Sequence, residues 1–153
     1  MDLPPFSWSQ TLEHALRVLI AFVLALPVAW ERERSTRMMG LRTLPLVAVA
    51  SCAFILVGSA VVGDDAQANS RLLSGLMAGI GFIGGGAILK SDHSVRGTAT
   101  AASIWSTGVL GAAVGYGKIE IALLVSLVTL ATLLLLTPVE AIIGTRKPPG
   151  DDG

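Results

Sequence analysis

Charged residues are scarce in this chain: Asp, Glu, Lys and Arg make up only 14% of its 153 residues, and the formal net charge is zero. A neutral chain whose few charges form short clusters argues against nucleic acid as a partner. The single cysteine, Cys52, excludes an intrachain disulfide, and two histidines with one cysteine fall short of the usual ligands of a zinc site. We therefore expect neither a cofactor nor enzymatic activity.

Apolar residues, in contrast, are abundant. They make up 52% of the chain, and the mean hydropathy of +0.70 is too high for an ordinary soluble domain. The length allows one membrane domain without a sizeable soluble domain beside it. We assign residues 1–11 to an exposed lead that lacks the basic region of a signal peptide, residues 12–143 to the membrane domain, and residues 144–153 to a short cytoplasmic tail.

Five apolar runs are each long enough to cross a bilayer, which takes about 17–25 helical residues. They predict an all-α integral membrane protein with transmembrane helices over residues 12–30, 44–62, 72–89, 98–116 and 119–139. We interpret the charged residues 31–43 and the polar residues 63–70 as loops. The fifth run is rich in Leu, which is typical of a peripheral helix that faces lipid.

Glycine is concentrated in one region, because 11 of the 17 glycines lie between Arg71 and Gly117. Interior Gly weakens a helix in water by about 0.5–1 kcal/mol relative to Ala. In lipid, small residues four positions apart on one face let helix backbones approach closely. We therefore predict that the third and fourth helices form a tightly packed pair, with a packing set of Gly75, Gly79, Gly81, Gly84, Gly85, Gly86, Gly111, Gly115 and Trp105.

The basic residues are unequally divided between the two sides of the predicted bundle. One side receives eight of them and the other receives three, namely Arg17, Arg71 and Lys118. Basic residues favour the cytoplasmic side. The sequence therefore predicts an N-terminus outside and a C-terminus in the cytoplasm, with the basic residues on the inner side being Arg32, Arg34, Arg37, Arg42, Lys90, Arg96, Arg146 and Lys147.

Two short patterns resemble enzyme motifs. Residues 79–84 match the dinucleotide-binding pattern G-x-G-x-x-G, but apolar membrane sequence flanks them and Ile104 lies near the position of the expected acidic residue. Asp92, His93 and Ser94 contain the residue types of a hydrolase triad, but adjacent side chains point in different directions. We interpret the first pattern as helix packing and the second as a polar loop.

The inner side of the predicted bundle carries two polar groups of residues. One follows the first span and includes Glu31 and Arg42, and the other, around Arg96, precedes the fourth span. An unpaired charge beside hydrocarbon is costly, so we expect Glu31 to pair with one of these arginines. A cation pathway would place carboxylates near the middle of the bilayer, whereas all acids lie near span ends or in loops. Transport therefore remains the second hypothesis, and any metal ligands are unknown.

Several of these segments together resemble a known family. In order, they are ERE at 31–33, GLRT at 40–43, Arg71 before GIGFIGGG at 79–86, and VRGTATAASIW at 95–105. This order is similar to that of the MgtC/SapB (YhiD-type) membrane proteins, and it covers almost the whole chain. The two polar groups on the inner side, together with Arg71, form the predicted functional cluster: Glu31, Arg32, Glu33, Arg37, Arg42, Thr43, Arg71, Arg96, Thr98 and Thr100. The family pattern matches seven of these residues, namely Glu31, Arg32, Glu33, Arg42, Thr43, Arg71 and Thr100.

The resemblance implies a protein of the bacterial inner membrane. The resemblance also implies a link to growth at low magnesium and a role as a regulator. We therefore expect a regulatory or scaffold protein that lies in the lipid bilayer, acts on partner membrane proteins, and could form a homodimer. A small Mg²⁺ transporter or channel subunit is the alternative.

Overall fold

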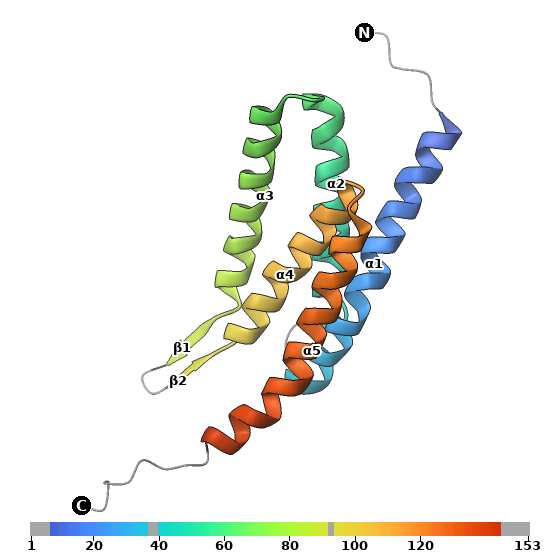
Figure 1. Cartoon of the computed structure of the whole chain (residues 1–153). Helices are drawn as coiled ribbons and strands as arrows, with labels where there is room; N and C mark the ends of the chain where they lie inside the picture. The colour runs from blue at the N-terminus through green and yellow to red at the C-terminus, as the bar shows by residue number, and fades with distance from the viewer. Residues whose placement is uncertain (1–6, 37–39, 92–93, 145–153) are drawn as a thin grey trace, which may run out of the picture.

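The computed structural model describes residues 7–36, 40–91 and 94–144, which form five helices and one short β-hairpin (Figure 1). The helices are α1 (Trp8–Thr36), α2 (Thr43–Val62), α3 (Ala66–Gly86), α4 (Thr98–Gly115) and α5 (Ile119–Gly144). Strands β1 (Leu89–Ser91) and β2 (Ser94–Arg96) pair antiparallel between α3 and α4, with Leu89 opposite Arg96. The structure therefore confirms the prediction of a helical protein with five helices.

Among the described helices, three are long and apolar enough to cross a membrane: α1, α2 and α5. The prediction of five spans is not confirmed, because α3 and α4 are less apolar. Residues 66–71, four of which are polar, begin α3, and Ser, Thr, Ala and Gly make up most of α4. Spans across α3 and α4 remain a prediction that rests on their length of 21 and 18 residues.

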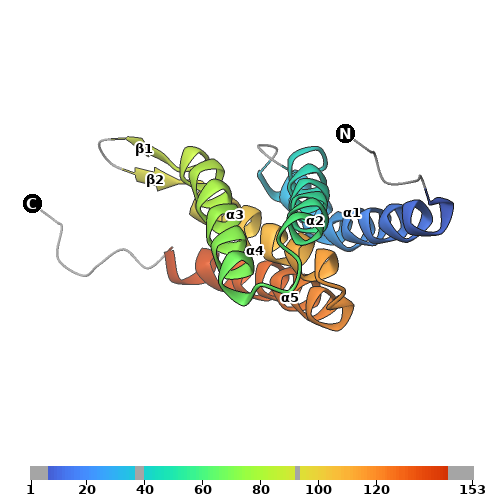
Figure 2. The same ribbon diagram turned by 90° about the horizontal axis from the view of Figure 1, so that it is seen from above.

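Helix α4 lies at the centre of the bundle and contacts each of the other four helices (Figure 2). Ten of its 18 residues are buried against the other helices, which explains why it can be rich in small and hydroxylated residues. The core consists of two clusters. Val28, Leu44 and Ile104 belong to the one nearer the hairpin, and Ala25, Cys52 and Leu110 belong to the other.

Several predicted boundaries need correction, since α1 begins at Trp8 inside the predicted lead and α5 continues to Gly144 instead of residue 139. The charged residues 31–36 are the last part of α1 and not a loop, since Glu and Arg are good helix formers. Helix α3 begins inside the predicted loop 63–70, because the Asp65 Oδ1 atom accepts hydrogen bonds from the backbone N–H groups of Gln67 at 2.8 Å and Ala68 at 3.0 Å. It ends at Gly86 instead of Leu89, which lies in β1.

Candidate functional site

The turn that precedes α2 packs against the charged end of α1. The Glu33 Oε2 atom accepts a hydrogen bond of 3.2 Å from the backbone N–H of Leu41. A Cβ atom at Gly40 would lie 2.5 Å from the Glu33 nitrogen and 2.6 Å from the Ala29 carbonyl oxygen, so only glycine fits there. Arg42 is the N-cap residue of α2 without a side-chain capping bond. Glu33 therefore holds the turn that positions Arg42.

The charged members of the predicted cluster do not form the expected ion pair. Arg42 and Arg96 are exposed, Glu31 is half-buried, and within the described part of the chain Glu31 makes no ion pair with either arginine. Arg32 is 3% exposed and Arg37 lies outside the described residues. Across the described ranges, no group of three His, Cys, Asp or Glu side chains could hold a metal ion.

The hairpin brings the Arg96 segment back to the end of α3. Gly97 has a φ of 87°, and a Cβ atom there would overlap the carbonyl oxygen of Ala87. Thr98 is exposed at the start of α4, whereas Thr100 is buried. Arg71 lies at the opposite end of α3 and so does not join this cluster, as Figure 1 shows from the course of the helix.

Three buried hydroxyl groups, those of Ser103, Thr107 and Ser126, donate to backbone carbonyl oxygens. Ser103 and Thr107 donate within α4, at 2.8 Å to Ala99 and 2.7 Å to Ser103. Ser126 of α5 donates across the bundle to the carbonyl of Leu24 in α1, at 2.7 Å. These bonds satisfy polar groups in an apolar interior and link helices to each other.

The glycines of α4 pack closely, but mainly against α2. A Cβ atom at Gly111 would overlap the Ala48 carbonyl oxygen, and one at Gly115 would lie 2.7 Å from Ile55 Cβ. Contacts between α4 and α3 involve Gly108, against the Ile80 side chain, and Gly84, where a Cβ atom would lie 3.3 Å from the Ala101 carbonyl oxygen. Sequence reasoning missed Gly108, although it stands three residues before Gly111.

The other predicted packing residues of α3 face open space. No atom of another segment lies within 4 Å of the Cβ positions that would be built on Gly75, Gly79, Gly81, Gly85 and Gly86. The tightly packed pair of α3 and α4 is therefore not confirmed for these glycines. Trp105 is 48% exposed.

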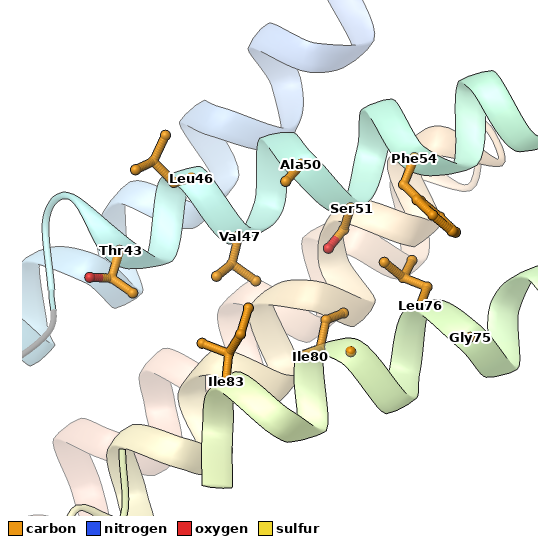
Figure 3. Close-up of a pocket in the computed structure, with 11 residues that line it drawn as sticks. Thr43, Leu46, Val47, Ala50, Ser51, Phe54, Gly75, Leu76, Ile80 and Ile83 are labelled. Carbon is orange, nitrogen blue, oxygen red and sulfur yellow. The ribbon is translucent and has the colours of Figure 1, made fainter. Parts of the chain in front are cut away.

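An apolar groove separates α2 from α3, and sequence reasoning did not predict it. Its volume is about 540 Å³ (Figure 3). Except for Thr43 and Ser51, its lining is apolar or glycine. The wall from α2 consists of Thr43, Leu46, Val47, Ala50, Ser51 and Phe54, and the wall from α3 consists of Gly75, Leu76, Gly79, Ile80 and Ile83. The small residues Ala50, Gly75 and Gly79 were the available sequence signal.

Residues 18–142 match the sequence profile of the MgtC family. Protein SrpB of Synechococcus elongatus is 37% identical over 143 residues, which cover 86% of this chain and 77% of SrpB. Protein MgtC of Brucella abortus is 34% identical over 136 residues, covering 89% of this chain and 56% of that protein, and an uncharacterized protein of Synechocystis sp. is 35% identical with the same coverage. The chain thus spans little more than half the length of two of these relatives. No solved structure matches it.

Proposed function

Because the chain belongs to the MgtC family of membrane proteins, we propose that it is a regulatory or scaffold protein of the bacterial inner membrane. In this proposal it acts on partner membrane proteins during magnesium limitation, as the family resemblance implies. The observation that supports contact with partners is the unfilled glycine surface of α3, at Gly81 and Gly85.

Gly81 and Gly85 stand four residues apart and therefore share one side of α3. Phe82, which is 85% exposed, lies beside them in the sequence. Lipid gives no hydrophobic drive for two helices to associate, so association depends on close backbone approach, which an open glycine surface permits. Helix α5, in contrast, exposes large side chains such as Leu124, Leu127 and Leu135, which suits lipid contact.

The arrangement of basic residues supports a cytoplasmic location for the hairpin end. Arg34 lies near the end of α1, Arg42 precedes α2, and Lys90 and Arg96 lie on the hairpin; Figure 1 shows these ends at the same end of the bundle. Arg17 lies toward the other end, because its Nη1 atom donates to the carbonyl oxygen of Gly115 at the end of α4. The positive-inside rule then favours an N-terminus outside the cell.

The test is growth at low magnesium of a bacterial strain that lacks the gene for this chain. Wild-type protein should restore growth, whereas Gly81→Leu and Gly85→Leu should fail to do so at normal abundance, because the added side chain blocks close approach of a partner helix. Ala131→Leu adds the same side chain to an exposed position of α5 and should restore growth. Full rescue by both glycine variants would contradict the proposal.

A second measurement separates this proposal from transport. Purified protein in liposomes should move no Mg²⁺ if it acts through partners. A clear flux that saturates with Mg²⁺ concentration would instead favour a transporter or channel subunit.

A further inference from the structure

The groove between α2 and α3 has the length of one bilayer leaflet. On α2 it extends from Thr43 to Phe54, which corresponds to about 16 Å along a helix axis. The hydrocarbon core of a bilayer is about 30 Å thick, so one leaflet contributes about 15 Å. The groove therefore lies within the half of the bundle that begins at Arg42.

The groove exists because α2 and α3 separate toward one end. Near their connecting turn the two helices are in close contact, since a Cβ atom at Gly58 would overlap the Leu72 side chain. Toward the hairpin they diverge, as Figure 1 shows. Small residues on both walls, such as Ala50 and Gly79, leave the space between them unfilled (Figure 3).

The width of the groove suits a hydrocarbon chain better than a protein helix. About 540 Å³ distributed over about 16 Å gives a mean cross-section of roughly 34 Å². A helix about 10 Å in diameter needs roughly 80 Å². The lining side chains Leu46, Leu76 and Ile83 offer apolar contacts and no charge, which matches an acyl chain.

Basic residues lie at the wide end of this groove. Arg42 directly precedes the lining residue Thr43, is exposed, and is followed by a first helical turn without an acidic residue. Lys90 and Arg96, on the hairpin after α3, are also exposed. Among the described residues, none of these three cations forms an ion pair. The nearby Glu33 carboxylate accepts the Leu41 N–H. Positive charge beside a leaflet surface attracts anionic lipid headgroups.

We propose that this groove binds one acyl chain of an anionic phospholipid from the leaflet on the Arg42 side, and that Arg42 binds its phosphate. An arginine guanidinium offers paired N–H donors that match phosphate oxygens. Lys90 and Arg96 add attraction for the headgroup. The inference rests on the membrane location of the protein and not on the regulatory role proposed above.

The experiment measures lipid binding to the purified full chain in detergent, by native mass spectrometry and by thermal unfolding. The lipids are phosphatidylglycerol and phosphatidylcholine with identical acyl chains, and glycerol phosphate serves as a headgroup without chains. Wild-type protein should retain phosphatidylglycerol in preference to phosphatidylcholine and should unfold at a higher temperature in its presence. Glycerol phosphate should produce no such shift.

Two pairs of variants test the two halves of the site. Gly79→Leu fills the groove and should abolish retention of phosphatidylglycerol, while Gly81→Leu, an equally open glycine of α3 that does not line the groove, should retain it. Arg42→Gln should weaken the phosphatidylglycerol affinity about fivefold, the effect expected for one basic residue at a membrane surface. Arg71→Gln, which removes the same charge at the other end of α3, should leave the affinity unchanged.

Equal retention of the two phospholipids by wild-type protein, or retention of phosphatidylglycerol by Gly79→Leu, would overturn the proposal. If Gly79→Leu does not fold, Ala50→Leu fills the groove from an exposed position on the opposite wall and serves as the second test. Because Gly81→Leu tests partner contact and Gly79→Leu tests the groove, failure of one proposal is distinguishable from failure of the other.

Discussion

Gly111 of α4 lies against the backbone of Ala48 in α2, so closely that even a methyl group on Gly111 would overlap the Ala48 carbonyl oxygen. One turn further, Gly115 takes the same kind of position against Ile55 and Cys52. The close backbone approach that glycine permits in membranes is therefore used between α4 and α2. Helix α3 keeps most of its glycines open.

Gly111→Ala should destabilise the bundle, because the backbone of α2 must move to admit a methyl group. The expected loss is about 1–3 kcal/mol, the usual range for overpacking. Gly85→Ala should instead stabilise the protein, by up to about 1 kcal/mol. Ala has a higher helix propensity than Gly, and the added methyl group would meet no other atom at this position. Thermal unfolding of both variants in the same detergent measures the difference, and equal melting temperatures would contradict the packing described here.

Gly40→Ala should disrupt the turn between α1 and α2, because its methyl group would meet the backbone of Glu33. Glu33→Ala should cost less, about 1 kcal/mol, since it removes one hydrogen bond to Leu41 N–H. Arg34→Ala, at an exposed position of the same helix end, is the control and should unfold like wild-type protein. If Gly40→Ala also melts like wild-type protein, the turn does not pack as described.

Arg17→Leu should lower stability more than Glu13→Gln. The Arg17 guanidinium donates to the Gly115 carbonyl at 3.0 Å, where the end of α4 leaves backbone oxygens without helical partners. Its ion pair with Glu13 involves a side chain that is 58% exposed, and such pairs contribute about 0–1 kcal/mol. Chemical unfolding at two salt concentrations helps to separate the effects, because the exposed ion pair should weaken with salt more than the partly buried bond to Gly115. An equal loss in both variants would argue against the helix-end role.

A reporter protein fused after Asp65 should lie outside the cell, and reporters fused after Arg37, His93 or Lys147 should lie in the cytoplasm. This outcome follows from the unequal distribution of basic residues if all five helices span the membrane. Two reporters check each position, one that is active only outside the cytoplasm and one that is active only in the cytoplasm. An outside signal at His93 would show that α3 does not cross the bilayer.

The sequence alone was sufficient for the helical membrane class, the family resemblance and the bounds of α4, which was predicted over residues 98–116 and is observed over Thr98–Gly115. These features depend on apolar runs and on glycine-rich motifs that are visible without coordinates. The spacing of glycines was less informative. Gly81 and Gly85 have the same spacing as Gly111 and Gly115, yet only the second pair meets a neighbouring helix. Spacing identifies a shared face, whereas tertiary packing decides what that face contacts.

The hairpin and the groove could not be predicted for related reasons. Strands β1 and β2 contain three residues each and are held by local backbone pairing, without the apolar alternation that marks a longer strand. The groove depends on the divergence of α2 from α3, which small residues such as Ala50 and Gly79 permit but do not specify. Likewise, Glu31 and Arg42 are both near the end of the bundle, but charge and proximity in the sequence did not produce an ion pair.

The central position of α4 has a consequence for biosynthesis. A segment composed largely of Ser, Thr, Ala and Gly gains little free energy from entering lipid alone, so the predicted insertion of α4 would depend on the helices that it contacts. Its principal receiving surface, α2, is translated earlier, and the Leu-rich α5 follows directly and covers part of the remaining side. The order of the helices along the chain thus places α4 after the helix that it contacts most has been made.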